Sequence, residues 1–509
     1  NVSPLKEQDI IEADIVFTSS MIVQKKSLDK VIKLCKKLGK TVVAGGPYPT
    51  SSYQKIDGVD HFVLNEAEIT LPQFLHDYHL SKARPLYFDE SKPDITATPA
   101  PRFDLLNMKR YSTMALQYSR GCPFSCEFCD IIEMFGRHPR TKKPLQFLAE
   151  MKDLYRLGYR GSLFIVDDNF IGNKRNVKEL LQEIAHWQEE MDYPFTLFTE
   201  ASIDLAADEE LLDLMVEAGF DMVFIGIETP VKETLILAKK KQNVSPDLLE
   251  SVHKIQKKGI EVAGGFIIGF DTDPEDISDK QIHFIQKSGI PAAMVGLLTA
   301  LPNTQLYRRL KAENRLLEDS PGNNTNEFRL NFLPKMDINK LLLSYREVIS
   351  NIYQPELYFQ RCITFLKNLK PHQKPMRKIS YTGIRAFILS LVIQTCSFYG
   401  WQYWKFILKA MVIKPALFSE AVAMAIKGHH FLKMTREILA TDSFKKYLEK
   451  IARSLQEKIS DISAADDCGQ TRRHAMSAFG CLPDREHRFC AGNECGIGAF
   501  HGDIRPAPE

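Results

Sequence analysis

Short hydrophobic runs alternate with helical patterns in two stretches of the chain. Near the N-terminus, apolar runs at 15–18, 41–44 and 61–64 are separated or followed by helical segments, the last ending near residue 78. From 111 to about 307, helical patterns alternate with six further apolar runs, at 115–118, 162–166, 195–199, 222–227, 262–268 and 293–298. Parallel strands joined by right-handed helical crossovers open into a sheet or curl toward a barrel. The pattern therefore predicts an α/β protein whose main part is a partial (β/α)6 barrel of the TIM type.

Changes in composition predict the domain boundaries. Pro85, Pro93, Pro99 and Pro101 lie among charged and small residues, as in an extended linker. After about residue 313 the strand pattern stops, and helical segments follow. The expected divisions are an α/β unit at 1–82, a linker at 83–110, the barrel at 111–312, an all-α domain at 313–459 and a disordered, cysteine-bearing tail at 460–509.

Residues 386–404 carry no charge and end in an aromatic cluster that includes Trp401 and Trp404. Nineteen residues are just enough to cross a bilayer, but Gln394 and other polar side chains interrupt the stretch. Three interpretations stay open: a membrane span, a helix buried in the all-α domain, and a helix that lies in the membrane interface beside Lys405 and neighbouring lysines.

Composition narrows the class of protein and its partners. Lys and Arg (66) nearly balance Asp and Glu (64), so no overall field attracts nucleic acid, and we expect no nucleic-acid partner. Ten cysteines in 509 residues are too few for a disulfide scaffold and favour the reducing cytoplasm. The chain opens with Asn1 and without a signal peptide, from which we expect a fragment or a processed chain.

Three cysteines stand close together after the first strand of the expected barrel. Cys122, Cys126 and Cys129 form a C-x3-C-x2-C pattern. A four-iron cluster held by only three protein thiolates leaves one iron open for a substrate or cofactor. Zinc is the alternative, but structural zinc takes four protein ligands, and the nearest histidine, His138, lies nine residues further on. The three cysteines are therefore the candidate metal ligands.

The segment from Ser119 to Cys129, Ser-Arg-Gly-Cys-Pro-Phe-Ser-Cys-Glu-Phe-Cys, resembles the signature of the radical S-adenosylmethionine (SAM) superfamily. The resemblance implies a [4Fe-4S] cluster whose open iron binds the amino and carboxylate groups of SAM. It also implies reductive cleavage of SAM to methionine and a 5′-deoxyadenosyl radical, with Phe128 against the adenine. Because the cofactors carry out the chemistry, we expect no catalytic side chain beyond them.

Polar residues after the next two strands resemble further parts of this cofactor site. Asp167, Asp168 and Asn169 follow the second strand, where the superfamily holds the methionine amino group. Glu200 and Ser202 follow the third strand and are similar to the segment near the ribose and carboxylate. Taken singly, the two aspartates would more often be a helix cap than cofactor contacts. Their position after the cysteine motif favours the cofactor site.

The fourth and fifth strands end in two more residues that the resemblance places at the SAM site. Glu228 stands in Gly-Ile-Glu-Thr at 226–229, and Gly269 ends the glycine-containing strand that the superfamily places beside adenine. Glycines allow close approach of the backbone to a ligand.

The N-terminal unit resembles the second half of the cobalamin-binding domain that precedes the barrel in one large subgroup of the superfamily. The resemblance rests on Gly-Gly-Pro at 45–47 and Asn-Glu-Ala-Glu at 65–68, and implies that Gly45 and Gly46 approach the corrin or its tail. The first half, with the D-x-H-x-x-G segment that supplies the lower cobalt ligand, would precede Asn1. We therefore expect a truncated Rossmann-like half-domain and infer cobalamin from the resemblance, with a cap that binds nothing as the alternative.

Over about residues 10–440 the chain is similar to the cobalamin-dependent radical SAM subgroup with an appended helical domain, which includes hopanoid C-2 methylase. The similarity implies C-methylation of an unactivated carbon in a hopanoid-like lipid or another apolar small molecule. It also implies an external electron donor, such as a flavodoxin or a ferredoxin. We expect a cytoplasmic enzyme with peripheral contact at the inner face of the membrane.

Two other functions stay open. A radical SAM enzyme that modifies RNA would be expected to carry a second cysteine triad ahead of the barrel, whereas residues 1–110 hold only Cys35. A non-catalytic iron–sulfur or SAM-binding protein is the other alternative, although an electron carrier would normally ligate all four irons.

The remaining cysteines are not expected to bind a metal. Cys35, Cys362 and Cys396 stand in apolar helical settings, which predicts packing roles. The four cysteines of the tail have spacings that fit no zinc or cluster pattern: Cys468, Cys481, Cys490 and Cys495.

Overall fold

The structure is a computed structural model that describes residues 5–318, 320, 322, 328–370 and 381–441. The predictions about the tail at 460–509, including its four cysteines, lie outside the described residues. The chain divides into a large unit, Asn1–Leu432 with His501–Glu509, and a small unit, Lys433–Phe500. The fold described below is that of the large unit.

The N-terminal part is a four-stranded parallel sheet in the order β1-β2-β3-β4, as the α/β pattern predicts. Helix α2 packs on it through Leu28, Ile32 and Cys35, which share one face at helical spacing. The strand β4 lies within the segment 83–110 that the prolines mark as a linker. The elements of this part are α1 (Glu7–Ile11), β1 (Ile15–Ser19), α2 (Lys25–Lys37), β2 (Thr41–Gly45), α3 (Pro47–Ser52), β3 (His61–Val63), α4 (Ala67–His79) and β4 (Leu86–Tyr87).

The central part is a six-stranded parallel sheet in the order β12-β11-β10-β9-β8-β5. Its two edge strands, β5 and β12, are not paired with each other in the described residues, so the barrel is a partial one. All six strands form where the hydrophobic pattern predicts them, within one or two residues. The strands are β5 (Thr113–Leu116), β8 (Gly161–Ile165), β9 (Phe195–Ala201), β10 (Phe220–Glu228), β11 (Glu261–Ile268) and β12 (Ala293–Leu297).

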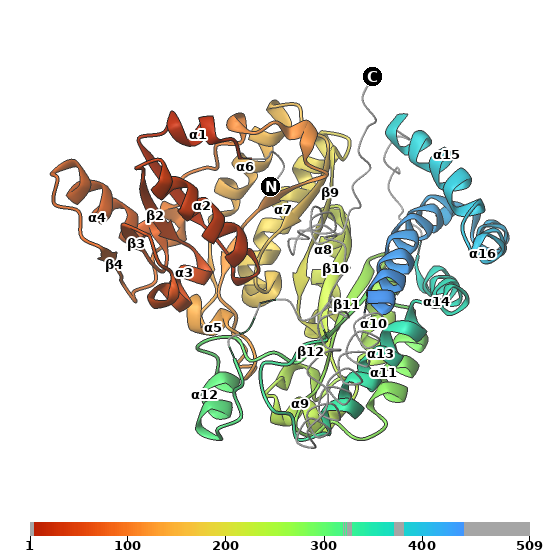
Figure 1. Cartoon of the computed structure of the whole chain (residues 1–509). Coiled ribbons are helices and arrows are strands. Elements are labelled where there is room, and N and C mark those ends of the chain that lie inside the picture. Colours follow the sequence, from red (N-terminus) through yellow and green to blue (C-terminus); the bar gives the residue numbers. More distant parts are fainter. Residues whose placement is uncertain (1–4, 319, 321, 323–327, 371–380, 442–509) are drawn as a thin grey trace, which may run out of the picture. The chain divides into compact units, whose positions relative to one another are not determined.

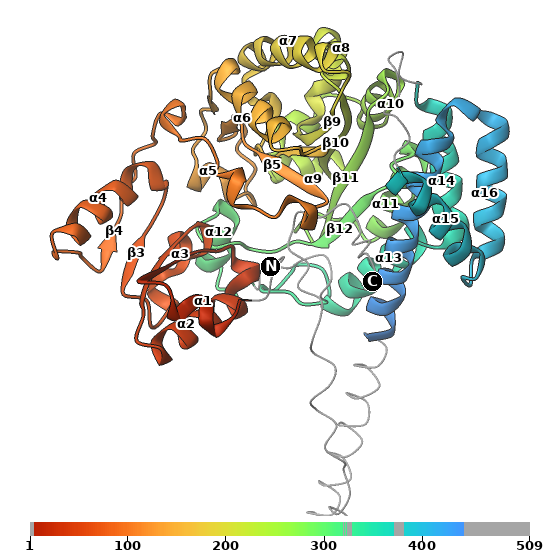
Figure 2. The same ribbon diagram turned by 90° about the horizontal axis from the view of Figure 1, so that it is seen from above.

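Helices connect these strands and cover one side of the sheet, as Figures 1 and 2 show for α7, α8, α10 and α11. Helix α10 has clear end signals: Asp247 caps its first turn and Gly259, with φ +106°, ends it. A small antiparallel hairpin of β6 and β7 stands beside the sheet. The remaining elements here are β6 (Ser119–Arg120), α5 (Ile131–Met134), β7 (Arg140–Thr141), α6 (Pro144–Arg156), α7 (Lys174–Glu190), α8 (Glu209–Glu217), α9 (Lys232–Leu237), α10 (Leu248–Lys258), α11 (Ile277–Ser288) and α12 (Gln305–Ala312).

The C-terminal part is helical, as expected, and is tied firmly to the central sheet. Helices α13 (Ile338–Ile352) and α14 (Pro355–Asn368) pack on α11. Arg361 of α14 is 1% exposed and donates to Gln286 of α11 (2.6 Å) and to backbone carbonyls. Buried cations need such acceptors, so this arginine fixes how the helices sit on the sheet.

The uncharged stretch 386–404 is not one continuous helix. It is divided between α15 (Tyr381–Thr395) and α16 (Gly400–Ile413), with a turn between them. No helix among the described residues is long and apolar enough to cross a membrane. Cys35 and Cys362 are buried, as their packing roles require, whereas the same prediction is wrong for Cys396, which is exposed because it lies in this turn.

Candidate cofactor site

The three cysteines lie on the loop that follows β6. Gly121 begins the loop with φ +96°, and a Cβ there would stand 3.0 Å from the carbonyl oxygen of Gly136. The N–H of Cys122 donates to that same oxygen (3.2 Å), and the N–H of Cys129 donates to the carbonyl of Cys126 (3.3 Å). Only glycine fits where the chain turns into the loop.

The thiols receive amide donors from neighbouring elements. All three are free; Cys126 is buried and the other two are partly buried. Asn169 Nδ2 lies 3.9 Å from Cys122 Sγ, and Gln242 Nε2 lies 3.6 Å from Cys126 Sγ. Burial raises the pKa of Cys122 and of Cys129, so a bare thiolate is disfavoured and a bound metal would be needed to stabilise it.

The donor set fits an iron–sulfur cluster. No three His, Cys, Asp or Glu side chains in the described part of the chain converge as ligands of one metal ion would. In a four-iron cluster each thiolate ligates its own iron. Hydrogen bonds from N–H groups to the sulfurs help to set the reduction potential of the cluster. Cys122, Cys126 and Cys129 would hold such a cluster, with one iron left for SAM.

Asp167 and Asp168, at the end of β8, hold the chain that leads into the cysteine loop. Asp167 is 1% exposed; its carboxylate accepts from the N–H groups of Tyr118 (2.7 Å) and Ser119 (2.8 Å). Asp168 accepts from the N–H of Gly121 (2.9 Å). Burial raises the pKa of Asp167 to about 7 and that of Asp168 to about 6. The geometry makes Asp167 a support of the loop, whereas its predicted contact with SAM stays a prediction.

Asn169 and Ser202 join the ends of β8 and β9. Asn169 Nδ2 donates to Ser202 Oγ (3.1 Å), and the N–H of Ser202 donates to Asn169 Oδ1 (3.3 Å). The carboxylate of Glu200, on the same strand end, forms no hydrogen bond or ion pair with any described residue. Burial, together with the negative charge of Asp168, raises the pKa of Glu200 to about 7. Among the predicted SAM contacts, Glu200 is thus the carboxylate that is free to accept from a ligand.

Glu200→Gln is expected to stabilise the protein without cofactors, and to do so most above pH 7. The pKa of Glu200 rises from 4.5 to about 7 on folding. Between these values the native state binds more protons than the unfolded state, so the free energy of unfolding falls as pH rises. The variant lacks this loss, and its advantage in unfolding free energy should be about 3 kcal/mol larger at high than at low pH.

Denaturant unfolding of both proteins near pH 5 and near pH 8 measures this difference. The exposed Glu183→Gln, on α7, serves as the matched control and should change little at either pH. An equal gain for Glu200→Gln at both pH values would contradict the assigned environment.

A buried ion pair lies beside the cysteine loop. Glu228 ends β10 with φ +64°, and its Oε1 lies 2.6 Å from Lys240 Nζ. The ammonium group is 5.9 Å from the centre of the Phe128 ring. Burial by itself would lower the pKa of Lys240, but the negative charge of Glu228 raises it. The cation thus lies beside the ring of Phe128, the residue before Cys129, where it would offset the negative charge of a thiolate-ligated cluster.

Sequence reasoning missed Lys240, because nothing distinguishes it from its neighbours. Lys239 and Lys241 on either side are exposed, and only the fold buries the middle one. Gly226 makes room for the pair, since a Cβ there would stand 2.3 Å from Glu228 Oε1. The one signal of this buried pair in the sequence was Gly226, which stands two residues before Glu228 at the end of β10.

The predicted adenine-side residues meet at the end of β11. The rings of Phe128 and Phe270 are 5.8 Å apart, edge to face. Gly269 has φ +112°, and its N–H donates to Asp273 Oδ2 (2.7 Å), as does that of Phe270 (3.0 Å). Burial raises the pKa of Asp273 to about 7. Asp273, which the sequence analysis missed, thus fixes the turn that follows Gly269.

Glu127, inside the cysteine motif, anchors the loop to two other elements. Its N–H donates to the carbonyl of Ala238 (3.0 Å), and its own carbonyl accepts from Leu306 (2.7 Å). Its carboxylate pairs with Arg309 of α12 (2.9 Å), which also pairs with Asp271 (2.8 Å). The loop is held from both sides before any cofactor binds.

The segment 65–68 of the N-terminal part contacts the chain just ahead of the cysteine loop. Glu66, whose side chain is 2% exposed, pairs with Arg120 (2.8 Å) and with Arg140 (2.8 Å). Glu68 also pairs with Arg120 (2.8 Å), which is two residues before Cys122. These four charges, here named the Glu66 junction, join two motifs that the sequence analysis found separately and did not expect to touch.

The predicted cobalamin-contacting glycines end β2. A Cβ on Gly45 would stand 2.6 Å from the carbonyl oxygen of Val63, and one on Gly46 (φ +88°) would stand 2.6 Å from Ser19 Oγ. The chain's own packing therefore already requires both glycines. The hydroxyl of Ser20, at the end of the neighbouring strand, is buried without a partner among the described residues. At this end of β2 the backbone is free of bulky side chains and the hydroxyl of Ser20 is available as a hydrogen-bonding group. Both features fit a bound ligand.

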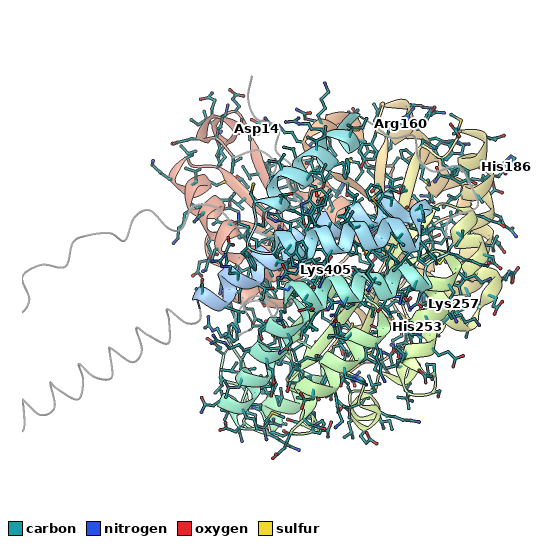
Figure 3. All side chains as sticks on the ribbon, turned by 90° about the vertical axis from the view of Figure 1, so that its right-hand side faces the viewer. Asp14, Arg160, His186, His253, Lys257 and Lys405 are labelled. Atoms are coloured by element: carbon teal, nitrogen blue, oxygen red, sulfur yellow. The ribbon has the colours of Figure 1, made fainter. Side chains whose placement is uncertain are left out.

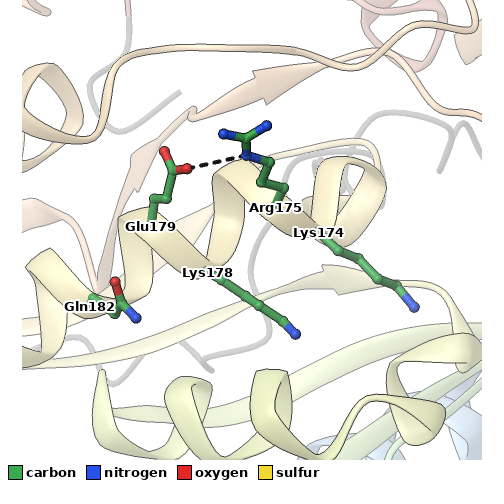
Figure 4. A pocket seen from close by; sticks show the side chains of 5 residues that line it. All are labelled: Lys174, Arg175, Lys178, Glu179 and Gln182. Atoms are coloured by element: carbon green, nitrogen blue, oxygen red, sulfur yellow. Dashed lines mark ion pairs between the residues drawn. The ribbon is translucent and has the colours of Figure 1, made fainter.

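A depression of about 410 Å³ lies on the surface of α7 and is distinct from this site (Figure 4). Five charged or polar side chains line it, and Arg175 pairs with Glu179 at 3.5 Å. It contains none of the predicted site residues, and its charges are solvated side chains of the helix.

Comparisons with known proteins agree with the site. Residues 116–312 match the Radical SAM superfamily, and residues 304–443 match a domain of unknown function, DUF4070. An uncharacterized methyltransferase of Synechocystis, sll1242, is 42% identical over 91% of this chain and 87% of its own length. Hopanoid C-2 methylase of Rhodopseudomonas palustris is 31% identical over 86% of this chain and 84% of its own length.

Two solved structures have a similar fold. The radical SAM methyltransferase TsrM from Kitasatospora setae, with cobalamin and a [4Fe-4S] cluster bound, has a TM-score of 0.56 at 14% identity, covering 83% of this chain and 90% of its own. The cobalamin-dependent enzyme OxsB, with aqua-cobalamin and SAM bound, has a TM-score of 0.55 at 16% identity, covering 85% and 73%.

The open sheet of six parallel strands and the three free thiols on the loop after its first strand fit an iron–sulfur enzyme that uses SAM. The chain belongs to the radical SAM superfamily, in the branch of radical SAM methyltransferases that contains these two relatives. The predicted fold class and family are confirmed, and membership implies the [4Fe-4S] cluster and SAM as cofactors.

Proposed function

We propose that this enzyme is a cobalamin-dependent C-methyltransferase that acts on an unactivated carbon of a hopanoid-like lipid or another apolar small molecule. When bound, the cofactors supply hydrogen abstraction by a 5′-deoxyadenosyl radical and a methyl group carried by cobalamin. The chain's own residues hold these groups, orient the substrate and exclude water.

The observation that carries the proposal is the Glu66 junction. It connects the part of the chain that resembles a cobalamin-binding half-domain to the loop that would hold the cluster. Buried arginine–carboxylate pairs of 2.8 Å fix orientation as well as attraction. Because the methyl group of cobalamin and the radical from SAM must reach the same carbon, the parts of the chain that hold the two cofactors need a rigid connection.

The residues at the end of β2 support cobalamin as the second cofactor. Gly45 and Gly46 keep the backbone clear of side chains, and the buried hydroxyl of Ser20 lacks a partner within the described residues. Cobalamin in the solved TsrM and OxsB structures agrees with this assignment.

The proposed substrate class rests on one of the relatives. The name hopanoid C-2 methylase, at 31% identity, points to an apolar polycyclic lipid as the kind of substrate. An external one-electron donor, such as a flavodoxin or ferredoxin, would reduce the cluster. A cytoplasmic location suits an oxygen-sensitive cluster ligated by free thiols.

Transfer of labelled methyl from SAM tests the proposal. The chain is loaded anaerobically with iron, sulfide and cobalamin, reduced, and incubated with methyl-labelled SAM and a bacterial lipid extract that contains hopanoids. We expect label in the apolar extract from the wild type and from Cys396→Ala, which changes an exposed cysteine outside the motif. Cys126→Ala should transfer none.

Other outcomes would contradict the proposal. Cleavage of SAM with no label in any apolar product would exclude lipid methylation. Label in added RNA would favour the RNA-modifying alternative, and a loaded cluster with no cleavage of SAM would favour the non-catalytic one.

A further inference from the structure

Helix α15 turns apolar residues outward and polar residues inward. Ile388 and Val392, one helical turn apart, are 54% and 60% exposed, whereas Ser390 and Gln394 are 6% and 1% exposed. Gln394 Nε2 donates to Ser390 Oγ (2.7 Å), so the buried polar groups satisfy each other. A helix at a water-facing surface normally has the opposite arrangement. The outer face of α15 is therefore suited to apolar surroundings.

Helix α16 also exposes apolar residues while it is anchored by others. Its inner face packs on α14, where the rings of Phe406 and Phe359 stack at 4.9 Å. Its outer face presents Trp401, Leu408 and Val412, which are 73%, 58% and 83% exposed. These three share one side of the helix at i, i+7 and i+11. The exposure is thus not a consequence of a loosely attached helix.

The exposed apolar residues are concentrated in this one place. Eleven of the thirty exposed large hydrophobic side chains in the described part of the chain fall between 384 and 412. Scattered exposed leucines are ordinary, but a cluster of this size marks an interaction surface. We define the α15–α16 surface by its most exposed members: Ile388, Val392, Phe398, Trp401, Leu408 and Val412.

The stretch of sequence that contains this surface carries charges of one sign. From 357 to 419 the sequence contains ten lysines and arginines and no aspartate or glutamate. Lys405 and Lys409 are exposed and follow Trp401 at one and two helical turns, so they border the apolar residues directly. Figure 3 looks onto this side of the molecule, with Lys405 labelled.

We propose that the α15–α16 surface docks the protein onto a lipid bilayer that carries anionic headgroups. Apolar and tryptophan side chains beside lysines are the pattern of helices that lie in the membrane interface. A second copy of the chain is the less suitable occupant, because a two-fold contact through this face would bring the cationic stretch against itself. The anionic headgroups instead complement it.

This inference does not rest on the proposed function. The surface lies within the residues that match the domain of unknown function and contains none of the predicted cofactor residues. The protein without cofactors is therefore expected to bind membranes, and a failure of either proposal can be distinguished from a failure of the other.

Flotation of the full chain with vesicles tests the docking surface. Vesicles of phosphatidylglycerol and phosphatidylcholine are compared with pure phosphatidylcholine. The wild type should bind the anionic vesicles, and the triple variant Trp401→Ser, Leu408→Ser, Val412→Ser should bind at least about tenfold more weakly. The matched control Leu105→Ser, Leu145→Ser, which changes two residues that are 71% and 67% exposed elsewhere, should bind like the wild type.

A second variant keeps the test valid if the triple variant folds poorly. Lys405→Gln with Lys409→Gln changes only exposed charges and should weaken binding to anionic vesicles by about fivefold for each lysine. Binding should also fall as salt is raised.

Three results would overturn the proposal. The first is equal binding of the wild type to neutral and anionic vesicles. The second is equal binding of the wild type and the triple variant to anionic vesicles. The third is a wild-type dimer in the absence of vesicles, with the triple variant monomeric. The last result would assign the surface to a second copy of the chain.

Discussion

Cys126→Ala is expected to abolish reductive cleavage of SAM and to leave the protein folded. Cys126 is one of three thiols on a loop that is already fixed by Gly121 and by Glu127, so its loss removes a ligand without releasing the loop. Loss of an outer partner of a metal site typically costs about 10–100-fold in affinity or activity, and loss of a ligand should cost more. The expected result is no detectable 5′-deoxyadenosine after anaerobic reconstitution and reduction, with a reduced iron content.

The control distinguishes a ligand from a cysteine that merely packs. Cys396→Ala removes an exposed thiol outside the motif and should retain both the iron content and the cleavage activity. Cleavage that survives in Cys126→Ala at the wild-type rate would reject the assignment of this loop as the cluster site, whatever the substrate of the enzyme.

Glu66→Ala is expected to destabilise the protein by up to about 3–5 kcal/mol, because it leaves two partly buried guanidinium groups without their shared carboxylate. The side chain of Glu66 is 2% exposed and those of Arg120 and Arg140 are 15% and 18% exposed. Chemical denaturation followed by circular dichroism measures the effect. Glu66→Gln keeps an oxygen acceptor for one arginine and should lose less.

An exposed ion pair provides the comparison. Asp153 and Arg156 pair at 3.0 Å, but their side chains are 45% and 73% exposed, so Asp153→Ala should cost about 0–1 kcal/mol. If Glu66→Ala cost no more than this control, the junction would not be a rigid connection, and the structural support for joint action of the two cofactors would be lost.

The sequence predicted the local features of this protein because each of them is coded locally. The six strands of the central sheet were placed within one or two residues, since a parallel sheet covered by helices produces short apolar runs between amphipathic stretches. The C-x3-C-x2-C pattern predicted a cluster loop because three thiolates around one cube are expected to lie close together along the chain.

Roles that depend on distant contacts were beyond such reasoning. Asp167 has the sequence position of a cofactor ligand, yet its carboxylate supports the backbone of Tyr118 and Ser119, almost fifty residues earlier. Lys240 is one of three consecutive lysines, and only the fold buries it, in an ion pair with Glu228 for which Gly226 leaves room.

In the C-terminal helices, too, the sequence predicted some features and the tertiary structure decided others. Composition marked 386–404 as unusual and left three interpretations open, because hydrophobicity alone does not say which side of a helix is covered. The fold decided this, by breaking the stretch at the turn before α16 and by burying Ser390 and Gln394 in place of their apolar neighbours.

The sequence by itself thus determined the fold class, through the periodicity of its apolar runs, and the superfamily, through the resemblance of the segment 119–129. It also predicted the three cysteine ligands. Only the tertiary structure decided which carboxylates are free and which support the loop, that Glu66 meets Arg120 and Arg140, and which face of α15 meets the solvent. Those features are set by contacts between residues far apart in the chain, and burial and pairing, not residue type, fix what a charged or apolar side chain does.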